Sequence, residues 1–182
     1  MTDPSLQQEK LYIALYTRDF YETEEAEDDG RYHWALLAVP PQPLPILNEP
    51  TIIKKATRFH ARDYHSGPSE THWLYEEIRV NPTGTQKLLA QIPIGDILDN
   101  ERFLELIRDL PIEQGVEGWN CVTWIKSALS AIDEDGEVVS GGMDEHAWMM
   151  LRVMALRAAD TEVERKTALA SLAGKEEMVA KF

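Results

Sequence analysis

Residues 31–39 read RYHWALLAV, a short run of aromatic and aliphatic side chains that stops at two prolines. A run of this length, bounded by turn-forming residues, predicts a buried strand rather than a helix. Four further stretches are interpreted as strands in the same way: residues 10–17, 52–64, 73–80 and 86–94. Five strands in succession with short connections predict an antiparallel sheet.

The turn signals indicate which of these strands are neighbours. Residues 81–84 read NPTG, a turn sequence, so we expect residues 86–94 to return beside residues 73–80 as a hairpin. The acidic residues 22–30 and the proline-rich residues 40–50 are expected to form irregular connections.

The second half of the chain changes to a helical period. Apolar residues at helical spacing predict helices over residues 101–110, 119–132 and 144–157. Asp99 or Asn100 is expected to cap the first helix. The second helix begins at Trp119 or Asn120, and its predicted buried stripe consists of Val122, Ile125, Leu129 and Ile132. Strands followed by helices predict an α+β fold, with one domain over residues 1–157 and a helical or partly disordered tail over residues 158–182.

Composition narrows the classes of partner and compartment. Hydrophobic residues form 43% of the 182-residue chain, which is typical of a globular protein. The formal net charge of −14 repels phosphate groups, so we expect no nucleic-acid partner and no docking on anionic membranes. No run approaches the ~18 apolar residues of a membrane span, and the first ten residues lack a signal-peptide pattern. We therefore expect a cytoplasmic protein.

The lone cysteine, Cys121, lies at the expected start of the second helix, in the segment GWNCVTWIKSAL of residues 118–129. With one cysteine, no intrachain disulfide can form. A thiol attacks carbonyls as the thiolate, which is scarce at neutral pH when the pKa is ~8.5. Amides at a helix N-terminus and a neighbouring imidazole favour the thiolate, so Cys121 is a candidate nucleophile. The alternative is a buried structural cysteine that behaves as a small apolar residue.

Two histidines fall within predicted strands. His33 shares one strand face with Ala35 and Leu37, so it points toward the core or toward a cleft that opens from it. His60 lies in the third predicted strand and shares its face with arginines. We expect His33 to serve the thiol as general base and acid, and His60 to orient the His33 imidazole. The alternative for His33 is a satisfied core histidine.

The residues beside these three are candidate substrate-binding residues, namely Trp119, Asn120 and Trp34. Cys121 with two or three histidines has the chemistry to bind zinc, but no ligands sit at the short paired spacings typical of zinc sites. We therefore expect no metal and no cofactor.

With a strand histidine, a second strand histidine and a helix-opening cysteine in this order, the chain resembles the circularly permuted members of the NlpC/papain-like superfamily. These include the lecithin:retinol acyltransferase-like proteins and the PPPDE peptidases. Tyr32-His33-Trp34-Ala35 resembles the first motif, His60 the second polar residue, and Asn120-Cys121 the nucleophile pair. The acyltransferase-like group usually continues with Glu-His-Phe, whereas this chain continues with Val-Thr-Trp. The chain also resembles fungal proteins of uncharacterised function.

The residues and the resemblance together favour a permuted papain-like fold. They also favour a cysteine-dependent hydrolase or acyltransferase that acts on an amide, ester or thioester carbonyl through an acyl-enzyme. The expected partner is a small-molecule or peptide substrate. The alternative is a non-catalytic binding protein on the same scaffold with a buried, inert cysteine. Substrate identity and oligomeric state stay open at this point.

Overall fold

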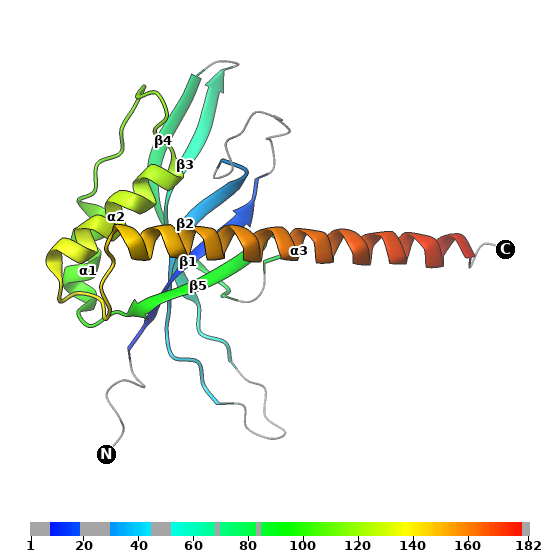
Figure 1. Ribbon diagram of the computed structural model, residues 1–182, viewed down its shortest axis with the longest axis horizontal. Coiled ribbons are helices and arrows are strands. Elements are labelled where there is room, and N and C mark those ends of the chain that lie inside the picture. The colour runs from blue at the N-terminus through cyan, green and yellow to red at the C-terminus, as the bar shows by residue number, and fades with distance from the viewer. Residues whose placement is uncertain (1–7, 19–29, 45–51, 68–69, 83–84, 180–182) are drawn as a thin grey trace.

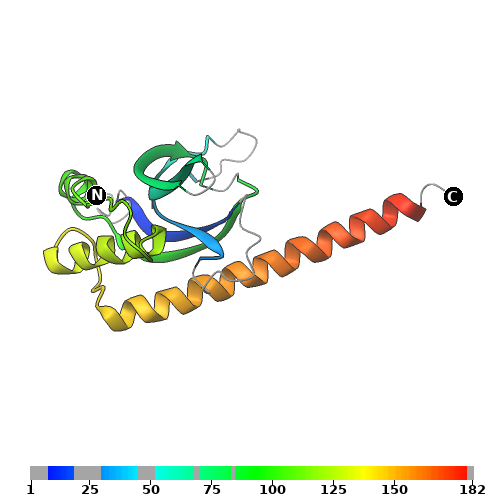
Figure 2. The same cartoon turned by 90° about the horizontal axis from the view of Figure 1, so that it is seen from above.

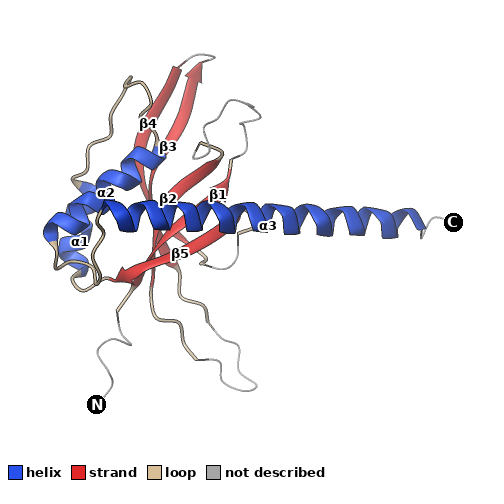
Figure 3. Cartoon of the chain, in the orientation of Figure 1, coloured by secondary structure: helices blue, strands red, loops and turns tan. Residues whose placement is uncertain are grey.

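The computed structural model describes residues 8–18, 30–44, 52–67, 70–82 and 85–179. These residues form a five-stranded antiparallel sheet followed by three helices (Figure 1, Figure 3), which confirms the predicted α+β class. The strands are β1 (Lys10–Thr17), β2 (Tyr32–Val39), β3 (Ala56–Gly67), β4 (Glu70–Val80) and β5 (Leu88–Asp96). The helices are α1 (Asn100–Arg108), α2 (Cys121–Asp135) and α3 (Glu145–Val179).

The strand order in the sheet is β4-β3-β2-β1-β5. The last strand, β5, pairs with β1 along its length, so the predicted hairpin between residues 73–80 and 86–94 is wrong. A turn sequence shows that the chain reverses but does not name its next neighbour. Here β1 is a largely apolar strand, and one of its edges is hydrogen-bonded to β2. The amides and carbonyls of its other edge also need partners, and β5 supplies them.

The sheet has two faces of different character. The helix face carries the larger apolar residues of the central strands, among them Ile13, Leu15, Trp34 and Leu36, and it packs against all three helices. The inner face carries a separate apolar cluster that has fewer residues and includes Ala14, Ala35 and Leu37. In Figure 2, α3 lies along one side of the sheet, while β3 and β4 curl away on the other side. The inner face is therefore buried by the curl of the sheet.

Side-chain caps fix where α1 and α2 begin. The Asp99 side chain accepts from the Arg102 amide at 3.0 Å, which confirms one of the two predicted caps of α1. The Asn120 side chain accepts from the amides of Val122 and Thr123, and the Thr123 hydroxyl accepts from the Asn120 amide. This reciprocal arrangement is a capping box. The four residues of the predicted stripe of α2 are all buried, as expected.

Helix α3 continues without a break through the end that we expected near residue 157. Residues 158–173 contain mainly alanine, glutamate and other good helix formers, and no proline interrupts them. Ala155 and Ala159 pack in the core, and the Lys166 ammonium donates to the carbonyls of Gln86 and Leu88. Past Lys166 the helix extends beyond the sheet (Figure 1).

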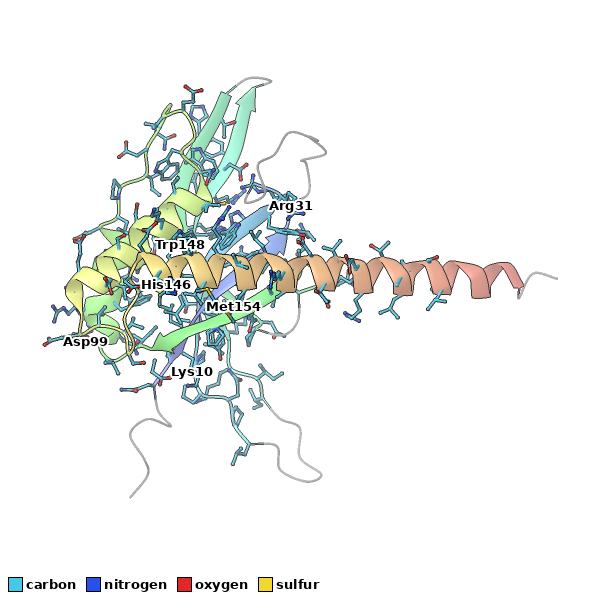
Figure 4. All side chains as sticks on the ribbon, in the orientation of Figure 1. Lys10, Arg31, Asp99, His146, Trp148 and Met154 are labelled. Atoms are coloured by element: carbon cyan, nitrogen blue, oxygen red, sulfur yellow. The ribbon has the colours of Figure 1, made fainter. Side chains whose placement is uncertain are left out.

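The outer side of the first half of α3 is apolar and exposed. Met149, Met150, Val153 and Met154 are each 41–58% exposed. Trp148, labelled with Met154 in Figure 4, lies on the opposite side of the helix and packs against Trp34 with ring centroids 5.9 Å apart. Among the helices that the structure describes, none combines the length and the apolar character needed to cross a membrane.

Candidate functional site

The structure divides the three predicted catalytic residues between the two faces of the sheet. Cys121 packs in the core of the helix face, together with Trp34 and Ala61. His33 and His60 alternate with those two residues along β2 and β3, so their side chains point to the inner face. The structure therefore brings the two histidines together and leaves the thiol on the opposite side of the sheet. This corrects our expectation that His33 lies beside the Cys121 thiol.

The inner face holds a chain of hydrogen bonds that sequence reasoning found only in part. His33 Nε2 lies 2.6 Å from His60 Nδ1, and His60 Nε2 lies 2.8 Å from Glu76 Oε2. Their positions follow from the register of the sheet, because His60 lies opposite Glu76 in the β3–β4 pair. We call His33, His60, Glu76, Arg58 and Arg62 the inner cluster.

The chemistry of the donors and acceptors determines which nitrogen carries each proton in the hydrogen bonds between His33, His60 and Glu76. An ionised carboxylate only accepts, so His60 Nε2 carries the proton that it donates to Glu76. In a neutral imidazole the other nitrogen is then bare, so His60 Nδ1 accepts from His33 Nε2. The unprotonated nitrogen at the end of this series of hydrogen bonds is therefore His33 Nδ1. Its lone pair can accept a proton or a hydrogen bond.

The surroundings keep both imidazoles neutral. Burial, reinforced by the charge of Arg58, lowers the pKa of His60 to about 4, although Glu76 opposes the shift. Burial also lowers the pKa of His33 well below its ordinary value, and His60 and the nearby arginines add to this effect. The contact between His60 and Glu76 is thus a hydrogen bond from a neutral imidazole rather than an ion pair.

Glu76 stays ionised and serves as the common acceptor of the cluster. Burial would raise its pKa, but the hydrogen bonds from His60 and Arg62 outweigh burial and lower it. Arg62 Nη1 donates to Glu76 Oε1 at 3.0 Å. Three of the four imidazole nitrogens and both carboxylate oxygens thus have hydrogen-bond partners within the cluster. Among the described residues, no three His, Cys, Asp or Glu side chains gather in a geometry that would hold a metal ion.

The thiol of Cys121 has a different set of neighbours. Arg18 Nη2 donates to Cys121 Sγ at 3.1 Å, and Arg18 also lies 3.8 Å from Asp63. The cysteine side chain is 0% exposed. Burial raises the pKa of the thiol, and the opposing effects of Arg18 and the Trp34 amide do not reverse the shift. Cys121 is the first residue of α2, as expected, but its thiol points into the core.

The three predicted substrate-binding residues have structural contacts. Trp34 is 0% exposed and lies deep in the core of the helix face. Asn120 uses its side chain to cap α2. Trp119 is half-buried and packs edge-on against Trp73, with ring centroids 5.4 Å apart. Of the three, only Asn120 and Trp119 retain partial exposure beside the start of α2.

Two charged residues were missed by sequence reasoning, namely Glu76 and Arg18, whereas Arg58 and Arg62 lie on the face of His60, as expected. Glu76 had a usable signal in the sequence. Strands β3 and β4 pair symmetrically about position 68, and His60 and Glu76 lie equally far before and after that position. A hairpin drawn about that centre places Glu76 beside His60. Arg18 follows a strand end and contacts the cysteine 103 positions later, which no local pattern indicates.

Comparison with known proteins places the chain in a family. Residues 8–176 match a family of unknown function (DUF6914), and the chain belongs to that family. No match was found among curated proteins, and none among solved structures.

Proposed function

We propose that this member of the DUF6914 family is a non-catalytic binding protein in which Cys121 is a structural residue of the core. The observation that carries the proposal is the separation of the thiol from the imidazoles by the sheet. A thiol nucleophile needs a base within hydrogen-bond reach, and its thiolate needs stabilisation. Cys121 instead has a raised pKa and a fully buried side chain.

Alkylation by iodoacetamide tests this proposal, because Cys121 is the only thiol in the chain. We expect slow reaction of the native protein, rapid reaction in denaturant, and the same pH profile in wild type and His33→Ala. A structural thiol needs local opening before it reacts, so its rate follows exposure rather than the His33 imidazole. An apparent pKa well below ~8.5 that rises in His33→Ala would contradict the proposal.

A second candidate is the cysteine-dependent hydrolase or acyltransferase, on a permuted papain-like scaffold. It is supported by the position of Cys121 at the capped N-terminus of α2 and by the Arg18 donor 3.1 Å from its sulfur. Both features favour a thiolate. The order of the histidine strands and the cysteine helix also supports the resemblance.

In this second reading, Cys121 attacks the carbonyl carbon, the leaving group departs with a proton from an acid, and water or an amine releases the acyl group. His33 would need to reach the thiol from the other face of the sheet. Pre-steady-state release of p-nitrophenol from p-nitrophenyl acetate tests this function. A burst in wild type that disappears in both Cys121→Ala and His33→Ala supports it, and equal rates in all three proteins exclude it.

A further inference from the structure

The inner cluster contains two arginines and one carboxylate. Both Glu76 oxygens already accept a short hydrogen bond, Oε1 from Arg62 at 3.0 Å and Oε2 from His60 at 2.8 Å. Arg58 Nη2 lies 3.7 Å from Oε2, which is an ionic contact but too long for a hydrogen bond. Arg58 is therefore the member of the cluster with the weakest anionic partner.

Arg58 also carries an unsatisfied donor. Its Nε–H is buried and has no hydrogen-bond partner in the part of the chain that the structure describes. The guanidinium lies over the Tyr16 ring, 5.1 Å from the centroid, which holds the side chain in place. Buried N–H groups in native proteins nearly always have a partner, so this one calls for a specific explanation.

The charges of the cluster do not balance. Arg58 and Arg62 carry one positive charge each, Glu76 carries one negative charge, and His33 and His60 are neutral, which leaves an excess of one positive charge. The nearby Arg18 lies 3.8 Å from Asp63 and adds no net charge with that partner. In a chain with a formal charge of −14, a net positive charge on a buried surface is a local exception.

A planar ion with one negative charge satisfies both features. The Nε–H and the adjacent Nη2 of a guanidinium form a two-donor edge that matches the two oxygens of a carboxylate. A monoanion neutralises the excess charge, whereas a dianion would leave the site negative beside Glu76. Solvent reaches the cluster at Arg62 and Glu76, whose side chains are 53% and 26% exposed.

We propose that the inner cluster binds the carboxylate of a small organic acid through the Nε–Nη2 edge of Arg58. The bound carboxylate replaces the long contact of Arg58 with Glu76. This inference names the ligand class of the binding protein proposed above and rests on that function.

Binding is coupled to protonation of the imidazole chain. The titratable and charged groups around His33 and His60 are Tyr16 from β1, Arg18 after β1 with its partner Asp63, Arg58 and Arg62 from β3, and Glu76 from β4. Their net positive charge disfavours imidazolium, and a bound anion removes part of that effect. The ligand therefore raises the histidine pKa values, and by linkage its affinity rises as the pH falls below the ordinary histidine pKa of 6.5.

Acetate is the probe, and the imidazole NMR signals of the isotope-labelled full chain are the readout. At constant ionic strength in chloride, we expect acetate to shift the His33 and His60 signals saturably and to leave those of His146, near the start of α3, unchanged. The affinity should rise as the pH falls from about 6.5 to about 5. Equal shifts with added chloride, stronger binding of phosphate at about pH 7.5, or no saturable shift would overturn the proposal.

Arg58→Gln should weaken acetate binding at least about tenfold. Arg62→Gln is the matched comparison, because it removes the same charge from the same strand but keeps the two-donor edge, so it should weaken binding less than Arg58→Gln does. Arg58→Lys keeps the charge without the two-donor edge, so it should also bind weakly, and it serves if Arg58→Gln does not fold. Wild-type affinity in Arg58→Lys, together with equal losses in Arg58→Gln and Arg62→Gln, would mean that charge alone matters and would overturn the assigned edge.

The two proposals fail separately. If Cys121 reacts rapidly with iodoacetamide and His33→Ala slows that reaction, the non-catalytic assignment is wrong, but the result of the acetate titration still decides the carboxylate site. A flat acetate titration with an inert Cys121 would remove the carboxylate site and leave the binding function.

Discussion

Mild acid should destabilise the protein through the buried imidazoles of His60 and His33. Both have native pKa values below the ordinary value of 6.5, so the unfolded chain binds more protons than the native one below about pH 6.5. The free energy of unfolding therefore falls as the pH falls. The direction is the reverse of that expected for a histidine held in an ion pair.

The magnitude follows from the pKa of His60. A native value of about 4 against 6.5 lowers the free energy of unfolding by about 1.4 kcal/mol between about pH 7.5 and pH 5.5. His33, which also stays neutral over this range, contributes at most the same amount again. The total is about 1.4–2.8 kcal/mol, or a shift of roughly 1 M in a urea midpoint.

Urea unfolding followed by tryptophan fluorescence measures this change in a buffer without carboxylate ions. His60→Gln is the informative variant, because an amide can donate to Glu76 and accept from His33 without titrating. We expect it to lose at least about half of the pH dependence. His146→Gln replaces an exposed histidine of α3 and should keep the wild-type dependence. A midpoint that is constant or rises toward about pH 5.5, or a full dependence in His60→Gln, would refute the reasoning.

Three further changes test the fold by the same urea assay. Gly95→Ala should lower the free energy of unfolding by at least about 2 kcal/mol, because a Cβ there would clash with the Ser140 carbonyl oxygen. Gly142→Ala, where a Cβ has ordinary clearance, is the control and should change stability by less than about 0.5 kcal/mol. Similar losses in the two variants would contradict this contact. Asn120→Ala should cost about 1 kcal/mol by removing the cap of α2, and Asn120→Asp should preserve it; equal losses would argue against the cap. Arg102→Ala should cost no more than about 1 kcal/mol, because the Arg102 side chain of its 2.6 Å ion pair with Asp135 is 48% exposed. A loss that persists in high salt would show another role.

The sequence predicted the elements better than their arrangement. Local signals placed the central strands and the start of α2 closely, because apolar runs and side-chain caps act within a few residues. The pairing of β5 with β1 depends on which strand edge is left open after folding, and no turn sequence encodes that choice. The continuation of α3 likewise involves contacts with distant parts of the fold, namely the hydrogen bond from Lys166 to Gln86 and the burial of Ala155 and Ala159 in the core.

The candidate site divides in the same way. The contact of His60 with His33 was predicted as an orienting interaction, and the two imidazoles do meet. The relation to Cys121 was wrong because both faces of β2 are apolar, so alternation alone did not show which face the helices cover. On β2 the helix face holds Trp34, Leu36 and Ala38, and the inner face holds Ala35 and Leu37, so residue size does not separate the two faces. Which face is covered depends on where the helices pack, and alternation does not encode that choice.

The part of α3 beyond Lys166 has a mechanical consequence. Thirteen residues of helix separate Lys166 from Val179, a length of about 20 Å. A tilt of about 10° about the Lys166 contact would move the tip by about 3 Å, so small adjustments where α3 meets β5 are enlarged at its far end. Spectroscopic labels at the C-terminal end of α3 and on the sheet would therefore report motions at the contact between α3 and β5 that are too small to measure at that contact itself.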